Sequence, residues 1–73
     1  MNDHELVQKV WELNRASIEL LSYPMPESDG ALGGYEMEAR SLDYDIDGLL
    51  EECDVRGLER KYALCGVARK KGA

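Results

Sequence analysis

The sequence predicts a small all-α protein, a three-helix bundle with helices over residues of about 4–22, 34–53 and 55–71. Apolar residues recur every three or four positions through most of the chain, which is the period of helices buried on one side. Two prolines and three glycines gather within residues 23–34, as expected of a loop between two helices. Apolar residues make up 44% of the chain and charged residues 33%, a composition typical of one globular domain.

The first predicted helix has clear signals at both ends. Asn2 or Asp3 can cap its start, and Pro24 ends it because proline restricts the preceding residue to extended conformations. Its apolar side chains cover about half of the helix circumference, more than two short neighbouring helices can bury. We therefore predict a homodimer that associates through this helix, with Trp11 and Ile18 at the contact. The apolar residues are Leu6, Val7, Val10, Trp11, Leu13, Ile18, Leu20 and Leu21.

A heptad seam runs along the second predicted helix. Its apolar residues are separated by steps of 4, 3, 4, 3 and 4 positions, the spacing of a helix that packs against a neighbour along its length. An alternating, strand-like pattern at residues 35–39 changes phase by Leu42, so a helix is favoured. The seam consists of Tyr35, Ala39, Leu42, Ile46, Leu49 and Cys53.

The third predicted helix ends with the basic run Arg69–Lys71. Positive charge in a last helical turn complements the helix dipole, and Gly72 would then end the helix. Its apolar face would contain Val55, Leu58, Tyr62 and Cys65.

Composition excludes several classes of protein. No stretch approaches the 18 or more apolar residues that span a bilayer. Asp3, Glu5 and Lys9 are incompatible with the apolar core of a signal peptide, so we expect a cytoplasmic protein. Cys53 and Cys65 are too few for a disulfide scaffold, and we expect both to be buried thiols.

The charge is distributed unevenly along the chain. Residues 27–54 hold ten acidic residues against Arg40 alone, whereas residues 55–73 hold six basic residues against Glu59. The acidic segment would repel nucleic acid and attract a basic protein surface. We therefore expect no direct nucleic-acid binding and no membrane binding.

The acidic residues form two rows if the second helix is unbroken. Like charges four positions apart, such as Asp43 and Asp47, each destabilise a helix by about 0.2–0.5 kcal/mol, and Arg40 is the only base nearby. A surface that only confers solubility usually mixes both signs, so a partner-binding surface is favoured over a merely solvated face. One row contains Glu36, Asp43, Asp47, Glu51 and Asp54, the other contains Glu38, Asp45 and Glu52, and Met37 and Tyr44 lie between them.

In size, acidity and helix content the chain resembles phage-encoded anti-CRISPR and anti-restriction inhibitors. This resemblance is one of class only, because no motif defines such proteins. It implies that the carboxylates imitate DNA phosphates, and that the partner is the basic surface of a nucleic-acid-binding protein or complex.

The same carboxylates allow an alternative. Residues 43–54, DYDIDGLLEECD, also resemble an EF-hand calcium loop, which has oxygen ligands at positions 1, 3, 5 and 12 and glycine at position 6. The resemblance implies that Asp43, Asp45, Asp47 and Asp54 hold calcium, and that the helix is broken at 43–48 by a Gly48 with positive φ. Position 12 is aspartate here, where the family usually has glutamate.

Catalytic chemistry is not indicated. The chain has no threonine, and its only histidine, His4, is close to a chain end, so a nucleophile paired with an oriented base is not available. A helical bundle of this size also has little room for a deep cleft. We therefore expect a non-catalytic acidic binder or inhibitor without a cofactor. The alternatives are a calcium-binding module and a small helical regulator that dimerises.

Overall fold

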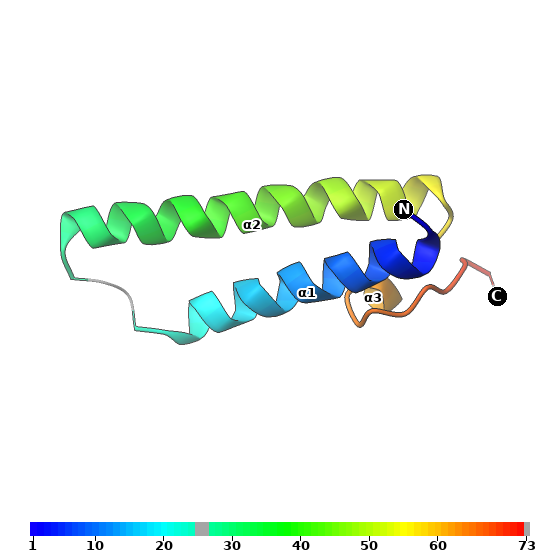
Figure 1. Cartoon of the computed structure of the whole chain (residues 1–73), viewed down its shortest axis with the longest axis horizontal. Coiled ribbons are helices and arrows are strands. Elements are labelled where there is room, and N and C mark those ends of the chain that lie inside the picture. Colours follow the sequence, from blue (N-terminus) through cyan, green and yellow to red (C-terminus); the bar gives the residue numbers. More distant parts are fainter. Residues whose placement is uncertain (25–26, 73) are drawn as a thin grey trace.

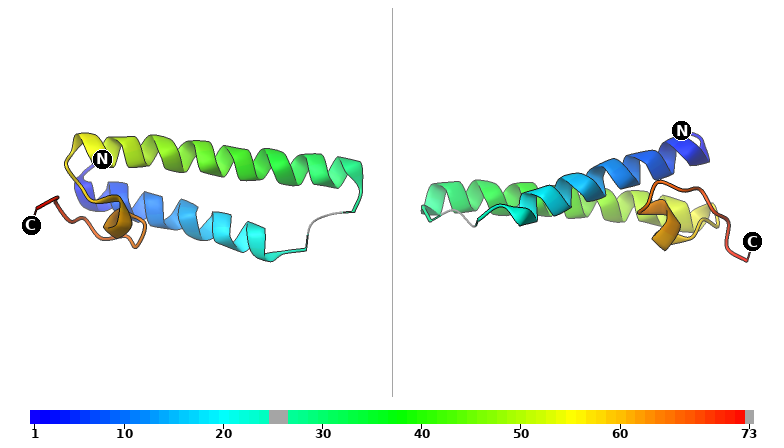
Figure 2. Two further views of the ribbon diagram at one scale, coloured as in Figure 1. Left: turned by 180° about the vertical axis from the view of Figure 1, so that it is seen from behind. Right: turned by 90° about the horizontal axis from the view of Figure 1, so that it is seen from below.

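The computed structural model describes residues 1–24 and 27–72. Within them the chain forms three helices, α1 (Asp3–Ser22), α2 (Asp29–Val55) and α3 (Arg60–Ala63). The two long helices make an antiparallel hairpin, and α3 lies across the end of it where α1 begins and α2 ends (Figures 1 and 2). The predicted all-α fold class is confirmed, although the third helix is much shorter than predicted.

The start and end of α1 follow from local sequence. The side chain of Asn2 accepts a hydrogen bond of 2.7 Å from the backbone N–H of Glu5, and the Glu5 carboxylate accepts one of 3.3 Å from the N–H of Asn2. This capping box satisfies two backbone donors that the first turn leaves free. At the other end, Tyr23 is extended, with φ −81° and ψ 150°, as the residue before Pro24 should be.

The second helix begins earlier than predicted. α2 starts at Asp29, so residues 29–34 are helical where we expected a loop; Met25 and Pro26 of that predicted loop lie outside the described residues. Gly33 and Gly34 do not have positive φ, and each costs the helix up to about 1 kcal/mol relative to alanine. Leu32 favours the longer helix because it extends the heptad seam by one step and is half-buried.

Glycine ends α2 and so prevents the predicted third helix. Gly57 has φ +74° and donates to the carbonyl of Asp54 at 3.0 Å, while Leu58 donates to the carbonyl of Cys53 at 2.8 Å. These two bonds form a Schellman motif, the commonest way in which glycine terminates a helix. The prediction of one helix over residues 55–71 is therefore wrong.

A second glycine ends α3 after only four residues. Gly66 has φ +76°, and the N–H of Val67 donates to the carbonyl of Tyr62 at 2.8 Å, as in a second Schellman motif. The chain then returns to the end of α2, where Leu58 and Lys70 form an isolated antiparallel bridge. The run Arg69–Lys71 thus lies in an extended segment and not, as we predicted, in the last turn of a helix.

The core lies at one end of the hairpin, called here the closed end, which residues 57–71 cover. The opposite end, where the chain passes from α1 to α2, is called the open end. The radius of gyration is 14.3 Å and the extents are 48 × 18 × 18 Å, whereas a compact chain of this length would have a radius of about 11 Å. The buried residues are Leu6, Val7, Val10, Ile46, Leu50, Cys53, Leu58 and Ala63.

The predicted seam of α2 does face α1. Ile46 and Cys53 are buried, and the other four seam residues are half-buried. Burial raises the pKa of the Cys53 thiol, which keeps it protonated and unreactive. Cys65 is exposed, so the prediction that both thiols are buried is wrong for this one. It lies just before the glycine that ends α3, outside the buried face.

Of the described helices, none is both long enough and apolar enough to cross a membrane.

Candidate binding surface on α2

The predicted acidic residues all lie on α2 and are exposed. Because α2 is continuous and each residue turns by about 100°, the carboxylates form the two predicted rows. Met37 and Tyr44 lie between the rows, with 74% and 81% of their surface exposed, and Val55 continues this line with 82%. We call Met37, Tyr44 and Val55 the outer strip. These three side chains are about 10 and 17 Å apart along the helix axis, so each is available to a partner as a separate apolar contact.

Two of the acidic residues have partners at the closed end. Asp54 accepts hydrogen bonds from Arg60, the shortest being 2.6 Å from Nη2 to Oδ2, and lies 3.8 Å from Lys71 Nζ. The bond from Arg60 holds the pKa of Asp54 below its usual range. Glu52 accepts a bond of 3.0 Å from Nε of Arg56. These pairs fix the end of α2 against the segment that follows it.

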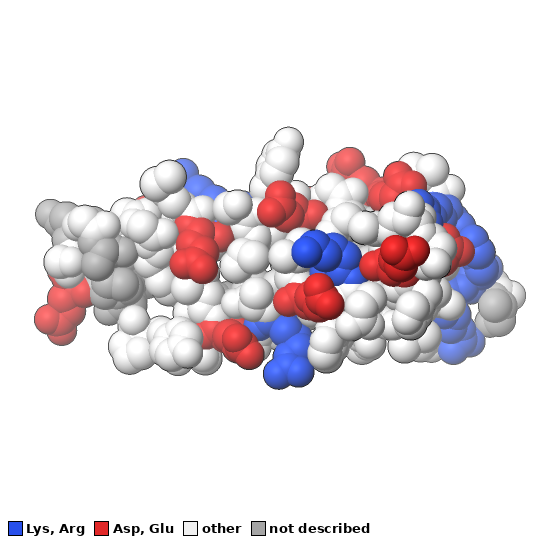
Figure 3. All heavy atoms as spheres, viewed as in Figure 1, with Lys and Arg blue, Asp and Glu red and all other residues white. Residues whose placement is uncertain are grey.

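The remaining carboxylates form no ion pair within the described residues. Arg40 on the same helix also forms none there, so it does not neutralise any one of them. In Figure 3 acidic side chains are spread along the hairpin, and basic ones are densest at the closed end, on the right. We call these six carboxylates the acidic face: Glu36, Glu38, Asp43, Asp45, Asp47 and Glu51.

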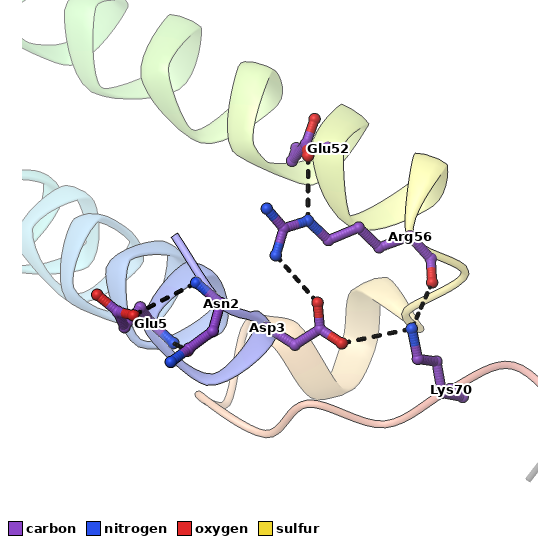
Figure 4. A network of polar contacts seen from close by, with 6 residues as sticks. All are labelled: Asn2, Asp3, Glu5, Glu52, Arg56 and Lys70. Carbon is purple, nitrogen blue, oxygen red and sulfur yellow. Dashed lines mark hydrogen bonds and ion pairs between the residues drawn. The ribbon is translucent and has the colours of Figure 1, made fainter.

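The basic residues after α2 are used within the chain. Arg56 Nη1 donates to Oδ1 of Asp3 at 3.0 Å, Lys70 Nζ lies 3.3 Å from Oδ2 of Asp3, and Lys70 also donates to the carbonyl of Arg56 at 2.8 Å (Figure 4). The hydrogen bond from Arg56 lowers the pKa of Asp3. One carboxylate at the start of α1 therefore joins the end of α2 to the returning chain.

A shallow groove of about 440 Å³ runs between α1 and α2 beside the acidic face. Tyr44 and Asp45 of the predicted surface lie on its α2 side. Gly48 lies on the same side of the groove, between Asp45 and Leu49 in the sequence. A Cβ added at Gly48 would meet nothing within 4 Å, so the absence of a side chain there leaves space in the groove. This groove was not predicted from the sequence, although a glycine within a helical apolar pattern is a signal for it. The groove is lined by Met1, Lys9, Leu13, Tyr44, Asp45, Gly48 and Leu49.

The calcium alternative requires a loop at residues 43–48, and the chain is helical there. On a helix, Asp43 and Asp45 point about 160° apart, so they cannot converge on one ion with Asp47. No group of three His, Cys, Asp or Glu side chains among the described residues could hold a metal ion. The geometry therefore favours a surface made of separate carboxylates.

The two residues predicted for self-association differ in exposure. Trp11 is half-buried under the chain that follows α3, where a Cβ on Gly66 would lie only 3.3 Å from Trp11 Cβ. Arg15 lies over the Trp11 ring at 5.1 Å from its centroid. Ile18, one heptad further along α1, is 59% exposed. Of the two residues, only Ile18 is thus available to a partner.

Together these features define a class of protein: a small helical hairpin, closed at one end, whose longer helix α2 carries exposed apolar side chains and six carboxylates that form no ion pair within the part of the chain that the structure describes. When the chain is compared with known protein families, with characterised proteins and with solved structures, it matches none of them.

Proposed function

We propose that the chain is a non-catalytic inhibitor that occupies a basic nucleic-acid-binding surface of a partner protein. The observation that carries this proposal is the acidic face, in which six carboxylates that form no ion pair with any described residue lie beside the exposed outer strip on one continuous helix. Neighbouring like charges destabilise the free helix, and a basic partner would relieve that repulsion on binding.

The linear charge density supports this kind of partner. Residues 36–51 span about 22 Å of helix, so the two rows of the acidic face, on opposite edges of the outer strip, together have roughly one carboxylate per 4 Å of helix axis. A single nucleic-acid strand has one phosphate per about 3.4 Å of duplex axis. Arg40 lowers the net density somewhat. The face therefore matches one strand better than a duplex, and a groove lined with Lys and Arg for one strand is the preferred target.

The outer strip supplies the part of the contact that does not depend on charge. Grooves that hold single strands combine basic residues with aromatic side chains on which the bases stack. Tyr44, which is 81% exposed, presents a ring where a base would lie, with carboxylates on both sides of it. The neighbouring groove between Leu13 and Leu49 can accept an apolar side chain of the partner.

The resemblance to anti-CRISPR and anti-restriction inhibitors supports the choice of targets. We propose RNA-guided nucleases and restriction enzymes in the cytoplasm as partners, with the DNA strand as the competitor. The chain needs no catalytic group for this role, since occupying the site excludes the substrate.

A displacement assay tests the proposal. A labelled DNA, single-stranded for RNA-guided nucleases and double-stranded for restriction enzymes, is bound to each purified nuclease of a panel, and its anisotropy is followed as the protein is added. We expect release from at least one nuclease, and weaker release at higher salt because exposed charges are screened. The variant Glu38→Gln/Asp45→Asn should compete less well, whereas Glu12→Gln/Glu27→Gln, which removes two exposed acids elsewhere, should compete like the wild type. Equal losses in both variants, or no release from any nuclease, would contradict the proposal.

A further inference from the structure

The helix α1 has a heptad seam of its own, beside the face that packs against α2. Its residues follow one another in steps of 4, 3, 4 and 3 positions and include one polar residue, Asn14. At the closed end the seam is covered: Val7 is fully buried and Trp11 is half-buried against Gly66. At the open end it is uncovered, with Ile18 59% and Leu21 64% exposed. The seam consists of Val7, Trp11, Asn14, Ile18 and Leu21.

The segment that covers the closed end shows which kinds of side chain bind to this side of the hairpin. Leu58 and Ala63 are buried in the core, while Arg60 binds Asp54 through Nε and Nη2 at 2.6–3.1 Å. The covering segment is therefore amphipathic and basic, with its apolar side on the hairpin and its arginine on a carboxylate of α2. The hydrogen bond to Asp54 raises the pKa of Arg60, and the negative charge of Asp47 acts in the same direction.

The same pattern of carboxylates continues toward the open end. Asp47, Asp43 and Glu36 precede Asp54 by 7, 11 and 18 residues, each close to a whole number of helical turns. They therefore lie along the same side of α2 as Asp54. Beyond the reach of Arg60, this side has acidic residues and Arg40 on α2 and exposed apolar residues on α1, and no described segment of the chain covers it.

We propose that the open end docks a basic amphipathic helix of a partner protein, which continues the layer that α3 begins. Ile18 and Leu21 would contact its apolar side, and Glu36 and Asp43 its lysines or arginines. A second copy of this chain fits less well, because two chains of net charge −6 would bring acidic helices together. The docking surface shares Glu36 and Asp43 with the acidic face, but its apolar contacts lie on α1 and away from the groove. The inference therefore does not depend on the proposed nuclease target.

Calorimetric titration with a designed peptide tests this inference. The probe is a helical peptide of leucine and lysine in a heptad pattern, and the matched control peptide has glutamate in place of lysine. We expect one lysine peptide to bind per chain and the glutamate peptide not to bind. The variant Ile18→Ser/Leu21→Ser should weaken binding about tenfold or more, since two exposed aliphatic side chains lose their burial.

The control variant Met37→Ser/Tyr44→Ser changes two exposed apolar residues on the outer strip and should alter the affinity less than about twofold. All four residues are exposed, and circular dichroism should show unchanged helix content in both variants. Unchanged binding in both variants would show charge attraction without a defined apolar site, and equal weakening by both would show apolar contact spread over the surface; either result would overturn the inference. The inference would also be overturned if the free protein sedimented as a dimer and the Ile18→Ser variant as a monomer, because a second copy of the chain would then cover this face. If the protein displaced DNA from no nuclease, the proposed function would fail, but the expected binding of the lysine peptide would not change.

Discussion

Replacing Gly48 by alanine should stabilise the protein by about 1 kcal/mol. Gly48 lies in the interior of α2, seven residues before its end at Val55, where alanine is favoured over glycine by about 0.8–1.0 kcal/mol. Apart from its chain neighbours and the adjacent backbone of α2, the new methyl group would meet no atom within 4 Å, so neither a clash nor substantial burial changes this value. For a domain of this size the melting temperature should rise by about 4–8 °C.

Gly57→Ala is the matched control. Gly57 also has open space around its Cβ position, but its φ is +74°. Alanine in this left-handed conformation costs roughly 1–2 kcal/mol, so the same chemical change should lower the melting temperature. The two variants thus differ in the sign of φ and not in crowding.

Thermal melts followed by circular dichroism, with urea titrations to obtain the free energy of unfolding, measure both effects. A lower melting temperature for Gly48→Ala would refute the reasoning. It would show a positive φ at this position and a break in α2, as the calcium-loop alternative requires.

Three further predictions concern charge. Because ion pairs hold the pKa values of Asp3 and Asp54 below the usual range, their contribution to stability should be present above a pH of about 4 and lost as the pH falls further. Asp3→Asn/Asp54→Asn should therefore melt below the wild type at neutral pH and together with it in strong acid. Calcium at about 1 mM should leave the melting temperature unchanged, because a ligand stabilises only a fold that binds it; a saturable calorimetric signal would contradict this. Neutralising Asp43, Asp47 or Glu51 singly should weaken partner binding modestly, and the losses should accumulate in the multiple variant; loss of all binding after one change would indicate a single focused site.

The sequence predicted the two long helices because their signals are local. Asn2 and Pro24 mark the limits of α1, and the heptad seam of α2 identified the face that packs against α1. The predicted rows of carboxylates followed from that seam, since a continuous helix fixes the angle between any two of its residues. The start of α2 was not predicted because Gly33 and Gly34 indicated a loop. In the structure, the packing of Leu32 outweighs the low helix propensity of these two glycines.

The closed end could not be derived from periodicity. Gly57 and Gly66 are each followed by an aliphatic residue, which is the sequence pattern of a Schellman motif, and attention to it would have divided the third predicted helix. The contacts of Asp3 with Arg56 and Lys70 join residues more than fifty positions apart. Nothing in the local sequence specifies such pairs, because they depend on how the returning chain crosses the hairpin.

The position of the closed end has a consequence for the order of events during synthesis. A chain emerges from the ribosome N-terminus first, so α1 and α2 are complete before Leu58 and Ala63, which fill the core beside Leu6 and Val10. The bond between Lys70 and Asp3 then joins a residue that is made after α2 to the first residue of α1. Until residues 57–71 have emerged, the nascent hairpin has its apolar interior open on one side, so α1 and α2 reach their stable packing only after this later segment has been released.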